Sequence, residues 1–208
     1  MITTALFFAC LGAILYLIGF VPYIYHAFRG KVVPHPFTWT VGFMLSAINT
    51  YGLFLSDGFT DTLIPTVVRT WALFIGLFVG WYFIARISLN WFDYFCIILW
   101  VGCLFIASYI WVSEAIIPTI IVDILVLSPT LKKIWRDPDS EDIFAWVLTV
   151  FSQACLLLSL GHYTLENSLF WAYVMSVNAL VAILIYRRRL FVSTWTYKIK
   201  KLLSTFSL

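Results

Sequence analysis

Seven apolar stretches, separated by short polar connections, make up most of the chain. A helix needs about 20 mostly apolar residues to cross the hydrocarbon core of a bilayer, and each stretch approaches or exceeds that length. The pattern therefore predicts an all-α integral membrane protein with seven transmembrane helices. The expected spans are residues 3–22, 38–56, 62–85, 92–112, 115–134, 143–160 and 168–186.

Lysine and arginine are confined to alternate connections. The connections after the first, third and fifth stretches, together with the C-terminal tail, hold all thirteen of these residues except Arg69. The remaining connections carry Asp57, Asp61, Glu114 and Glu166 and no Lys or Arg. The positive-inside rule predicts an outside N-terminus and a cytoplasmic C-terminus, in the plasma (inner) membrane. The basic residues on the expected cytoplasmic side are Arg29, Lys31, Arg86, Lys132, Lys133, Arg136, Arg187, Arg188, Arg189, Lys198, Lys200 and Lys201.

The composition agrees with this topology. The chain is 62% hydrophobic and only 11% charged, whereas soluble domains have about 25% charged residues. The net charge of +3 comes from the expected cytoplasmic connections, so it does not indicate nucleic-acid binding. The four cysteines all lie within spans and are expected to pack as small apolar residues.

An internal repeat relates the two halves of the chain. A shift of 107 positions aligns the first three stretches with the last three without a gap. Three spans are an odd number, so a directly fused second copy would be inverted, and the unmatched fourth stretch restores the orientation. The repeat predicts two parallel three-helix bundles, residues 1–85 and 115–186, joined by an inversion helix within 86–114 and followed by a basic tail, 187–208. The matched residues include Pro22 with Pro129, Arg29 with Arg136, Phe37 with Phe144 and Trp39 with Trp146.

In this three-plus-one-plus-three plan, and in the paired Pro22 and Pro129, the chain resembles the SWEET and PQ-loop transporter superfamily. The resemblance covers residues 1 to about 190 and implies two three-helix bundles around a central solute pathway. Tyr23 follows Pro22 and Thr130 follows Pro129, so the PQ dipeptide itself is replaced at both sites. The resemblance therefore leaves the substrate open.

The two prolines suggest moving parts. A proline inside a helix removes one backbone hydrogen bond and kinks the helix. Pro22 and Pro129 lie near the cytoplasmic ends of their spans, so we expect them to be hinges of an inner gate. The alternative is a packing role, because membrane helices tolerate proline.

Two charged residues lie deep within spans. Arg69 and Asp123 are each about 10–12 Å from the outer surface at 1.5 Å per residue. Charges in hydrocarbon are costly and usually pair, so we expect an Arg69–Asp123 ion pair that joins the two repeats. The pair borders the solute cavity in one interpretation and only braces the bundles in the other.

Uncharged polar residues also lie near the midplane, namely Asn49, Gln153 and Asn178. For Asn49 and Gln153, interhelical hydrogen bonds are the alternative to solute binding. The resemblance implies that Asn178 faces the solute, and the repeat offset places Trp71 at the equivalent position of the first half. Arg69, Asp123 and these four residues form the predicted solute-binding set.

Other polar and aromatic residues receive simpler interpretations. Trp39 and Trp146 open their helices where aromatic belts are common. His26 and His35 have no carboxylates at metal-ligand spacing and are expected on the surface, so neither a metal nor a cofactor is predicted. The tail has apolar residues at helical spacing opposite lysines, which predicts an interfacial helix lying on anionic lipid.

Two functions fit these features. The first is a transporter for a small polar solute, such as a sugar, a nucleoside or a vitamin-like molecule, with alternating access and uniport as the expected mode. The second is a membrane receptor or scaffold that binds a ligand in the same cavity. The expected partners are the solute and the lipid bilayer, and homo-oligomerisation is open. The chain has no HExxH or GxSxG motif, and residues 168–186 contain no lysine for a retinal Schiff base, so neither an enzyme nor a photoreceptor is predicted.

Overall fold

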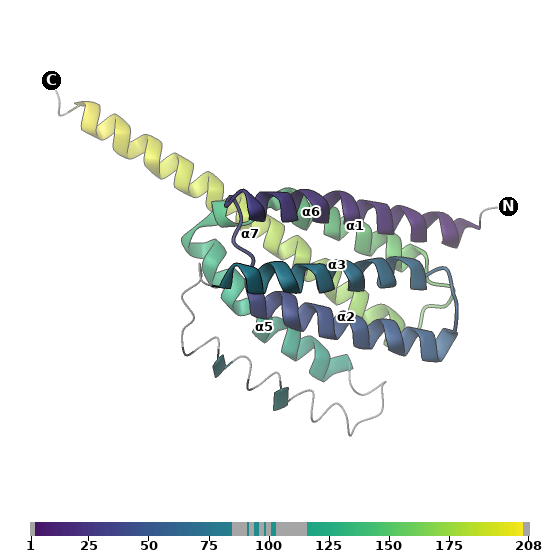
Figure 1. Cartoon of the computed structure of the whole chain (residues 1–208). Helices are drawn as coiled ribbons and strands as arrows, with labels where there is room; N and C mark the ends of the chain where they lie inside the picture. Colours follow the sequence, from purple (N-terminus) through teal and green to yellow (C-terminus); the bar gives the residue numbers. More distant parts are fainter. Residues whose placement is uncertain are drawn as a thin grey trace.

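The computed structural model describes residues 3–84 and 116–205, together with the isolated positions 91, 94, 95, 98, 101 and 102. All regular structure in these residues is helical, as predicted. The predicted fourth span, 92–112, and the linker 86–114 lie largely outside the described residues. The helices are α1 (Thr4–Phe28), α2 (Pro36–Asp57), α3 (Leu63–Tyr82), α5 (Ile116–Arg136), the short 3-10 helix η2 (Pro138–Ser140), α6 (Ile143–Leu158) and α7 (Leu165–Thr205) (Figure 1).

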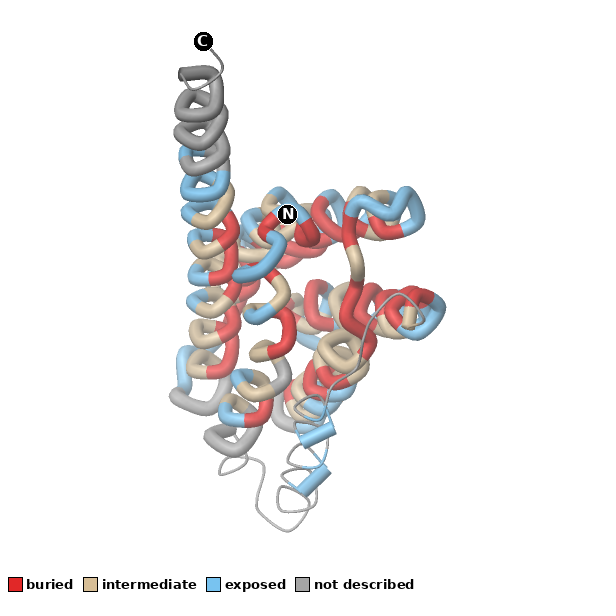
Figure 2. The backbone as a smooth tube through the Cα atoms, turned by 90° about the vertical axis from the view of Figure 1, so that its left-hand side faces the viewer, coloured by how far each residue is buried: buried red, intermediate tan, exposed pale blue. Residues whose placement is uncertain are grey.

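Three helices in the described part of the chain are long and apolar enough to cross a membrane. They are Thr4–Phe28, Leu63–Tyr82 and Ser168–Val192, with mean hydropathies of 2.3, 1.7 and 2.0. Ile143–Leu158 is apolar but shorter. Figure 2 shows buried residues on the helix faces that point toward neighbouring helices, whereas large apolar side chains such as Phe7, Ile14 and Val21 are exposed on α1. An apolar outer surface of this kind is expected of a protein surrounded by lipid.

Local capping explains where two of the helices begin. The Thr3 hydroxyl accepts a hydrogen bond from the backbone N–H of Leu6 at 3.1 Å, at the start of α1. At the start of α6, the Asp142 carboxylate accepts one from the N–H of Phe144 at 2.9 Å. Such caps satisfy backbone donors that have no partner within the helix.

The helix contacts are equivalent in the two halves. In the first half α3 contacts both α1 and α2, and in the second half α7 contacts both α5 and α6. Between the halves, α1 packs against α6 and α2 packs against α5. The first helix of each half therefore contacts the second helix of the other half.

Glycines allow α1 and α6 to approach closely. A Cβ built on Gly12 would lie 3.1 Å from the carbonyl oxygen of Ser152, and one on Gly19 would lie 3.1 Å from Cβ of Leu148. The Ser152 hydroxyl also donates a hydrogen bond to the Gly12 carbonyl at 2.8 Å. Small residues of this kind are typical of close helix packing within membranes.

The predicted interfacial tail is wrong as a separate element. Residues 187–205 continue α7, which runs unbroken from Leu165 to Thr205, and Figure 1 shows its C-terminal part projecting beyond the rest of the bundle. The physical reason is local, because no glycine or proline occurs between Tyr186 and Leu208 to end the helix.

Candidate functional site

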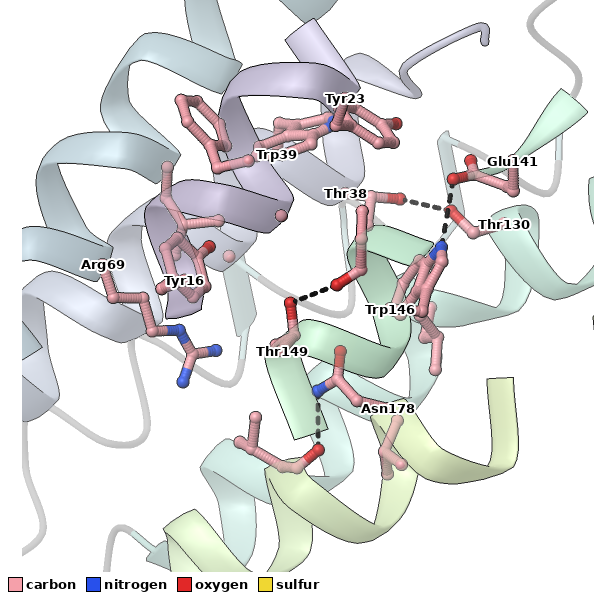
Figure 3. A pocket seen from close by; sticks show the side chains of 18 of the residues that line it. Tyr16, Tyr23, Thr38, Trp39, Arg69, Thr130, Glu141, Trp146, Thr149 and Asn178 are labelled. Carbon is pink, nitrogen blue, oxygen red and sulfur yellow. Dashed lines mark hydrogen bonds between the residues drawn. The ribbon is translucent and has the colours of Figure 1, made fainter. Parts of the chain in front are cut away.

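The site is a cavity of about 140 Å³ between the two halves of the chain (Figure 3). It lies among the six α-helices that the structure describes and includes residues of the α1–α2 and α5–α6 connections. The lining residues are Tyr16, Gly19, Phe20, Tyr23, His35, Thr38, Trp39, Gly42, Arg69, Leu73, Asp123, Leu127, Thr130, Glu141, Ala145, Trp146, Thr149, Val174, Val177 and Asn178.

Most of the lining from α1, α2, α5 and α6 obeys the predicted repeat. Six pairs of lining residues are separated by 107 positions, so equivalent places in the two halves face the same space. This agreement places the cavity at the centre of the internal repeat. The pairs are Tyr16 with Asp123, Phe20 with Leu127, Tyr23 with Thr130, Thr38 with Ala145, Trp39 with Trp146 and Gly42 with Thr149.

The third helix of each half departs from the predicted offset. Burial in α3 matches burial in α7 at a spacing of 105 residues, because Thr66 and Leu73 correspond to the buried Trp171 and Asn178. The ungapped alignment is therefore wrong by two residues in this helix. Between the N-terminus of the second helix and the buried face of the third helix, the second half has two fewer residues than the first half.

This shift removes Trp71 from the predicted binding set. The Trp71 side chain is 62% exposed and lies on the outer surface beside Leu17 and Ile75, not in the cavity. Leu73 takes the place that the sequence assigned to Trp71. Asn178, by contrast, lines the cavity as predicted and is 9% exposed. Its side-chain N–H donates a hydrogen bond to the Val174 carbonyl at 2.6 Å, and its amide oxygen takes no part in this bond.

Arg69 and Asp123 both line the cavity, but they do not pair directly. Ion pairs between described residues join His26 to Asp142, Lys133 to Glu141 and Arg189 to Asp139, and none joins Arg69 to Asp123. The predicted direct ion pair is therefore wrong. The two residues face one cavity from different helices, and each has its own uncharged partner.

Those partners are neutral side chains. The Tyr173 hydroxyl donates to Oδ2 of Asp123 at 3.0 Å. Arg69 donates from Nη1 to Oε1 of Gln153 at 3.4 Å, and its Cζ atom lies 5.4 Å from the centroid of the Trp171 ring. Figure 3 shows the guanidinium pointing into the pocket below Tyr16.

The other two predicted amides do not line the cavity. Gln153 is 1% exposed and links α6 to α3 through Arg69, so it makes the interhelical hydrogen bond that was the alternative. Asn49 donates to the Leu45 carbonyl of its own helix at 2.8 Å. Neither position is placed to contact a solute in this conformation.

The proposed hinge prolines lie inside helices. Pro22 is within α1 and Pro129 is within α5, and both helices continue beyond the proline, to Phe28 and Arg136. The residue after each proline, Tyr23 or Thr130, lines the cavity. Both prolines are therefore next to the cavity wall, and the hinge role remains a prediction.

Polar contacts between the halves close one end of the cavity. This end, here called the basic end, carries the connections 29–35 and 137–142. The contacts cross from α1, α2 and their connection to α5, η2 and the N-cap residue of α6. They are His26 Nδ1 with Asp142 Oδ2 (2.7 Å), Lys133 Nζ with the Val33 carbonyl (2.6 Å), Val33 N–H with the Ser140 carbonyl (3.3 Å) and the hydroxyls of Thr38 and Thr130 (3.0 Å).

Glu141 is the buried charge at this end, and the sequence did not single it out. Its side chain is 3% exposed and pairs with Lys133, while Trp146 donates from Nε1 to the second carboxylate oxygen at 3.2 Å. Arg189 donates to the Glu141 backbone carbonyl at 2.7 Å, so α7 also holds this connection in place. In the sequence Glu141 is one of four acidic residues between 137 and 142, and no local pattern distinguishes it.

Three surface assignments are also corrected, and the first is Trp146, which lines the cavity. Trp39 packs against Phe20 and Tyr23, with ring centroids 5.9 and 5.3 Å apart, and lines the cavity rather than the membrane interface. His35 is 6% exposed and lines the cavity too. His35 is the N-cap residue of α2, and Trp39 lies near the start of the same helix. No protein-family model, curated protein or solved structure matches the chain.

Proposed function

We propose that the chain is a membrane transporter for a small polar solute, which binds in the cavity between the two halves. The observation that carries the proposal is the lining by residue pairs 107 positions apart. Transporters with parallel repeats bind their solute near the midplane, at the interface between the repeats. The mixture of aromatic rings, hydroxyls, an amide and three charged residues, Arg69, Asp123 and Glu141, suits a polar solute.

The proposed architecture is the three-plus-one-plus-three plan. Residues 1–85 and 115–186 act as two parallel three-helix bundles, and a helix within 86–114 restores the orientation of the second. The contact of α1 with α6 and the contact of α5 with α2 each join the first helix of one half to the second helix of the other. This equivalence supports the arrangement. The basic end faces the cytoplasm of the plasma (inner) membrane, and the N-terminus is outside.

Transport then requires the two halves to separate at one end at a time. At the basic end the halves are joined by His26 with Asp142 and by Lys133 with Val33. At the opposite end the Thr62 hydroxyl donates to the Ser159 carbonyl at 2.9 Å. Opening one set of contacts while the other persists gives alternating access, and bending at Pro22 and Pro129 lets α1 and α5 follow. No step needs a coupled ion, so uniport is the proposed mode.

The alternative is a receptor or scaffold that binds the same solute without translocating it. The observation that favours this alternative is the length of α7, which spans 41 residues and projects beyond the bundle (Figure 1). A projecting helix offers a docking surface that a transporter does not need.

Uptake into liposomes separates the two functions. The purified protein is reconstituted, and influx of radiolabelled sugars, nucleosides, amino acids and vitamins is compared with that into protein-free liposomes. A transporter gives saturable influx that Asn178→Leu abolishes, because Asn178 lines the cavity, whereas Trp71→Leu on the outer surface leaves it unchanged. Binding of a solute without influx would support the receptor instead.

A further inference from the structure

Two opposite charges face one cavity from different halves without neutralising each other. Arg69 comes from α3 and Asp123 comes from α5, and both line the cavity. No ion pair joins them among the described residues. Their charges sum to zero, and the third charged residue of the lining, Glu141, is already paired with Lys133.

Both groups retain unused hydrogen-bonding capacity. A guanidinium has five N–H donors; Nη1 of Arg69 makes one long contact of 3.4 Å, and its buried Nε has no hydrogen-bond partner in the described structure. A carboxylate can accept about four hydrogen bonds, and within the described residues Asp123 accepts one, from Tyr173. A solute in the cavity can therefore be both a charged acceptor for Arg69 and a charged donor for Asp123.

Charge complementarity distinguishes among classes of solute. Charged groups at membrane depth are costly unless they are paired. A neutral sugar would compensate neither charge, an anion would compensate Arg69 but repel Asp123, and a cation would do the reverse. A solute that carries one positive and one negative group compensates both and adds no net charge to the cavity.

We infer that the cavity binds a zwitterionic solute, an α-amino acid or a close analogue, with its carboxylate on Arg69 and its ammonium on Asp123. The inference rests on the proposed function, because it names the solute of the same cavity. The volume of about 140 Å³ is below the roughly 300–1,000 Å³ of pockets for drug-sized ligands, which restricts the solute to a small molecule. Tyr23, Trp39 and Trp146 line the part of the cavity nearest the basic end and are placed to contact the solute's side chain.

Ligand-induced stabilisation of the purified wild-type protein tests the inference without any mutation. Each of the twenty common L-amino acids is added singly, with glucose and uridine as neutral solutes, and the melting temperature is measured. A ligand that binds only the folded state raises that temperature. We expect at least one amino acid to raise it more than either neutral solute does; stabilisation by glucose or uridine alone, or by nothing in the panel, overturns the inference.

Two analogues of the best amino acid then test the two charges. Its carboxamide keeps the ammonium and lacks the carboxylate, and its 2-hydroxy acid keeps the carboxylate and lacks the ammonium. We expect both to bind about tenfold or more weakly, because each leaves one charge of the cavity unpaired. Equal binding of the amino acid and either analogue overturns the assignment of the missing group.

Variants identify which residue binds the carboxylate of the solute and which binds its ammonium group. Arg69→Gln is expected to remove the advantage of the amino acid over its carboxamide, and Asp123→Asn the advantage over its 2-hydroxy acid. Trp71→Leu is the control, because its side chain lies on the outer surface. If both charge variants weaken the binding of all three ligands equally, Arg69 and Asp123 do not each recognise one charged group of the solute, and the inference fails.

Failure of this inference and failure of the proposed function give different results. If an amino acid binds but does not enter liposomes, the result supports the zwitterion site and refutes transport. A neutral solute that binds and enters liposomes, when no amino acid binds, leaves transport standing and refutes the zwitterion site.

Discussion

The indole ring of Trp39 occupies the space over Gly76: a Cβ built on Gly76 would lie 2.0 Å from Cε3 of Trp39. The two residues belong to α2 and α3 of the first half, and Trp39 also lines the cavity. The glycine therefore allows an aromatic residue at the start of one helix to lie flat against the next helix and form part of the cavity wall.

Gly76→Ala is expected to destabilise the protein. Overpacking costs about 1–3 kcal/mol, while alanine in place of glycine inside a helix offsets about 1 kcal/mol of this. The measurement is the thermal midpoint in detergent, together with solute binding. Adding Trp39→Leu should restore the midpoint, since it empties the occupied space. Gly161→Ala is the control, because nothing lies within 4 Å of its added Cβ; a Gly76→Ala protein as stable as this control would contradict the packing.

The Lys133–Glu141 pair is expected to respond asymmetrically to mutation. Lys133→Met leaves the 3% exposed Glu141 as a buried anion that keeps the Trp146 donor but has lost its cation, a change that costs about 3 kcal/mol. Glu141→Gln leaves Lys133, which is 20% exposed and keeps the Val33 carbonyl, and costs about 1 kcal/mol. Unfolding midpoints of the two variants test the order. A larger loss for Glu141→Gln would show that Lys133, not Glu141, is the more isolated charge.

Asp142 has two roles that substitutions can separate. One oxygen caps α6 and the other contacts His26 of the first half. Asp142→Asn keeps a good N-cap and should lose little helix stability, whereas Asp142→Ala loses the cap and about 1 kcal/mol. The comparison uses thermal midpoints of the two variants and of His26→Ala. Equal midpoints for Asn and Ala would mean that the cap does not contribute.

The orientation in the membrane can be read from single cysteines. In a background without the native cysteines, Lys31→Cys lies at the basic end and Phe59→Cys at the opposite end, where Phe59 is 89% exposed. A membrane-impermeant thiol reagent applied to intact cells should label only the cysteine at position 59, because the positive-inside rule places the basic end in the cytoplasm. Labelling of position 31 in intact cells would reverse the proposed topology.

Features that depend on neighbours in sequence were predictable. The apolar stretches placed the helices of both halves, because a segment that must bury or immerse its apolar residues forms a helix of matching length. The 107-residue offset predicted that the two halves are equivalent, and the cavity lining of their first two helices obeys it, from Tyr16 with Asp123 to Gly42 with Thr149. Asn178, which the family resemblance implied, and Arg69 and Asp123, which their positions within apolar stretches singled out, also line the cavity.

Features that depend on how one helix is rotated against another emerged only in the tertiary structure. The equal depths of Arg69 and Asp123 in their spans did not predict the contacts of Arg69 with Gln153 and Trp171, because depth alone does not determine the direction of a side chain. Lateral packing of the helices also decides three other features. It turns Trp71 outward through the two-residue shift, it buries Glu141 and His35, and it places the Trp39 ring against Gly76. The sequence by itself determined which segments are helices and which of them are equivalent, since both follow from local pattern. The packing of the halves decided which side chains meet in the cavity, because that depends on contacts between residues far apart in the chain.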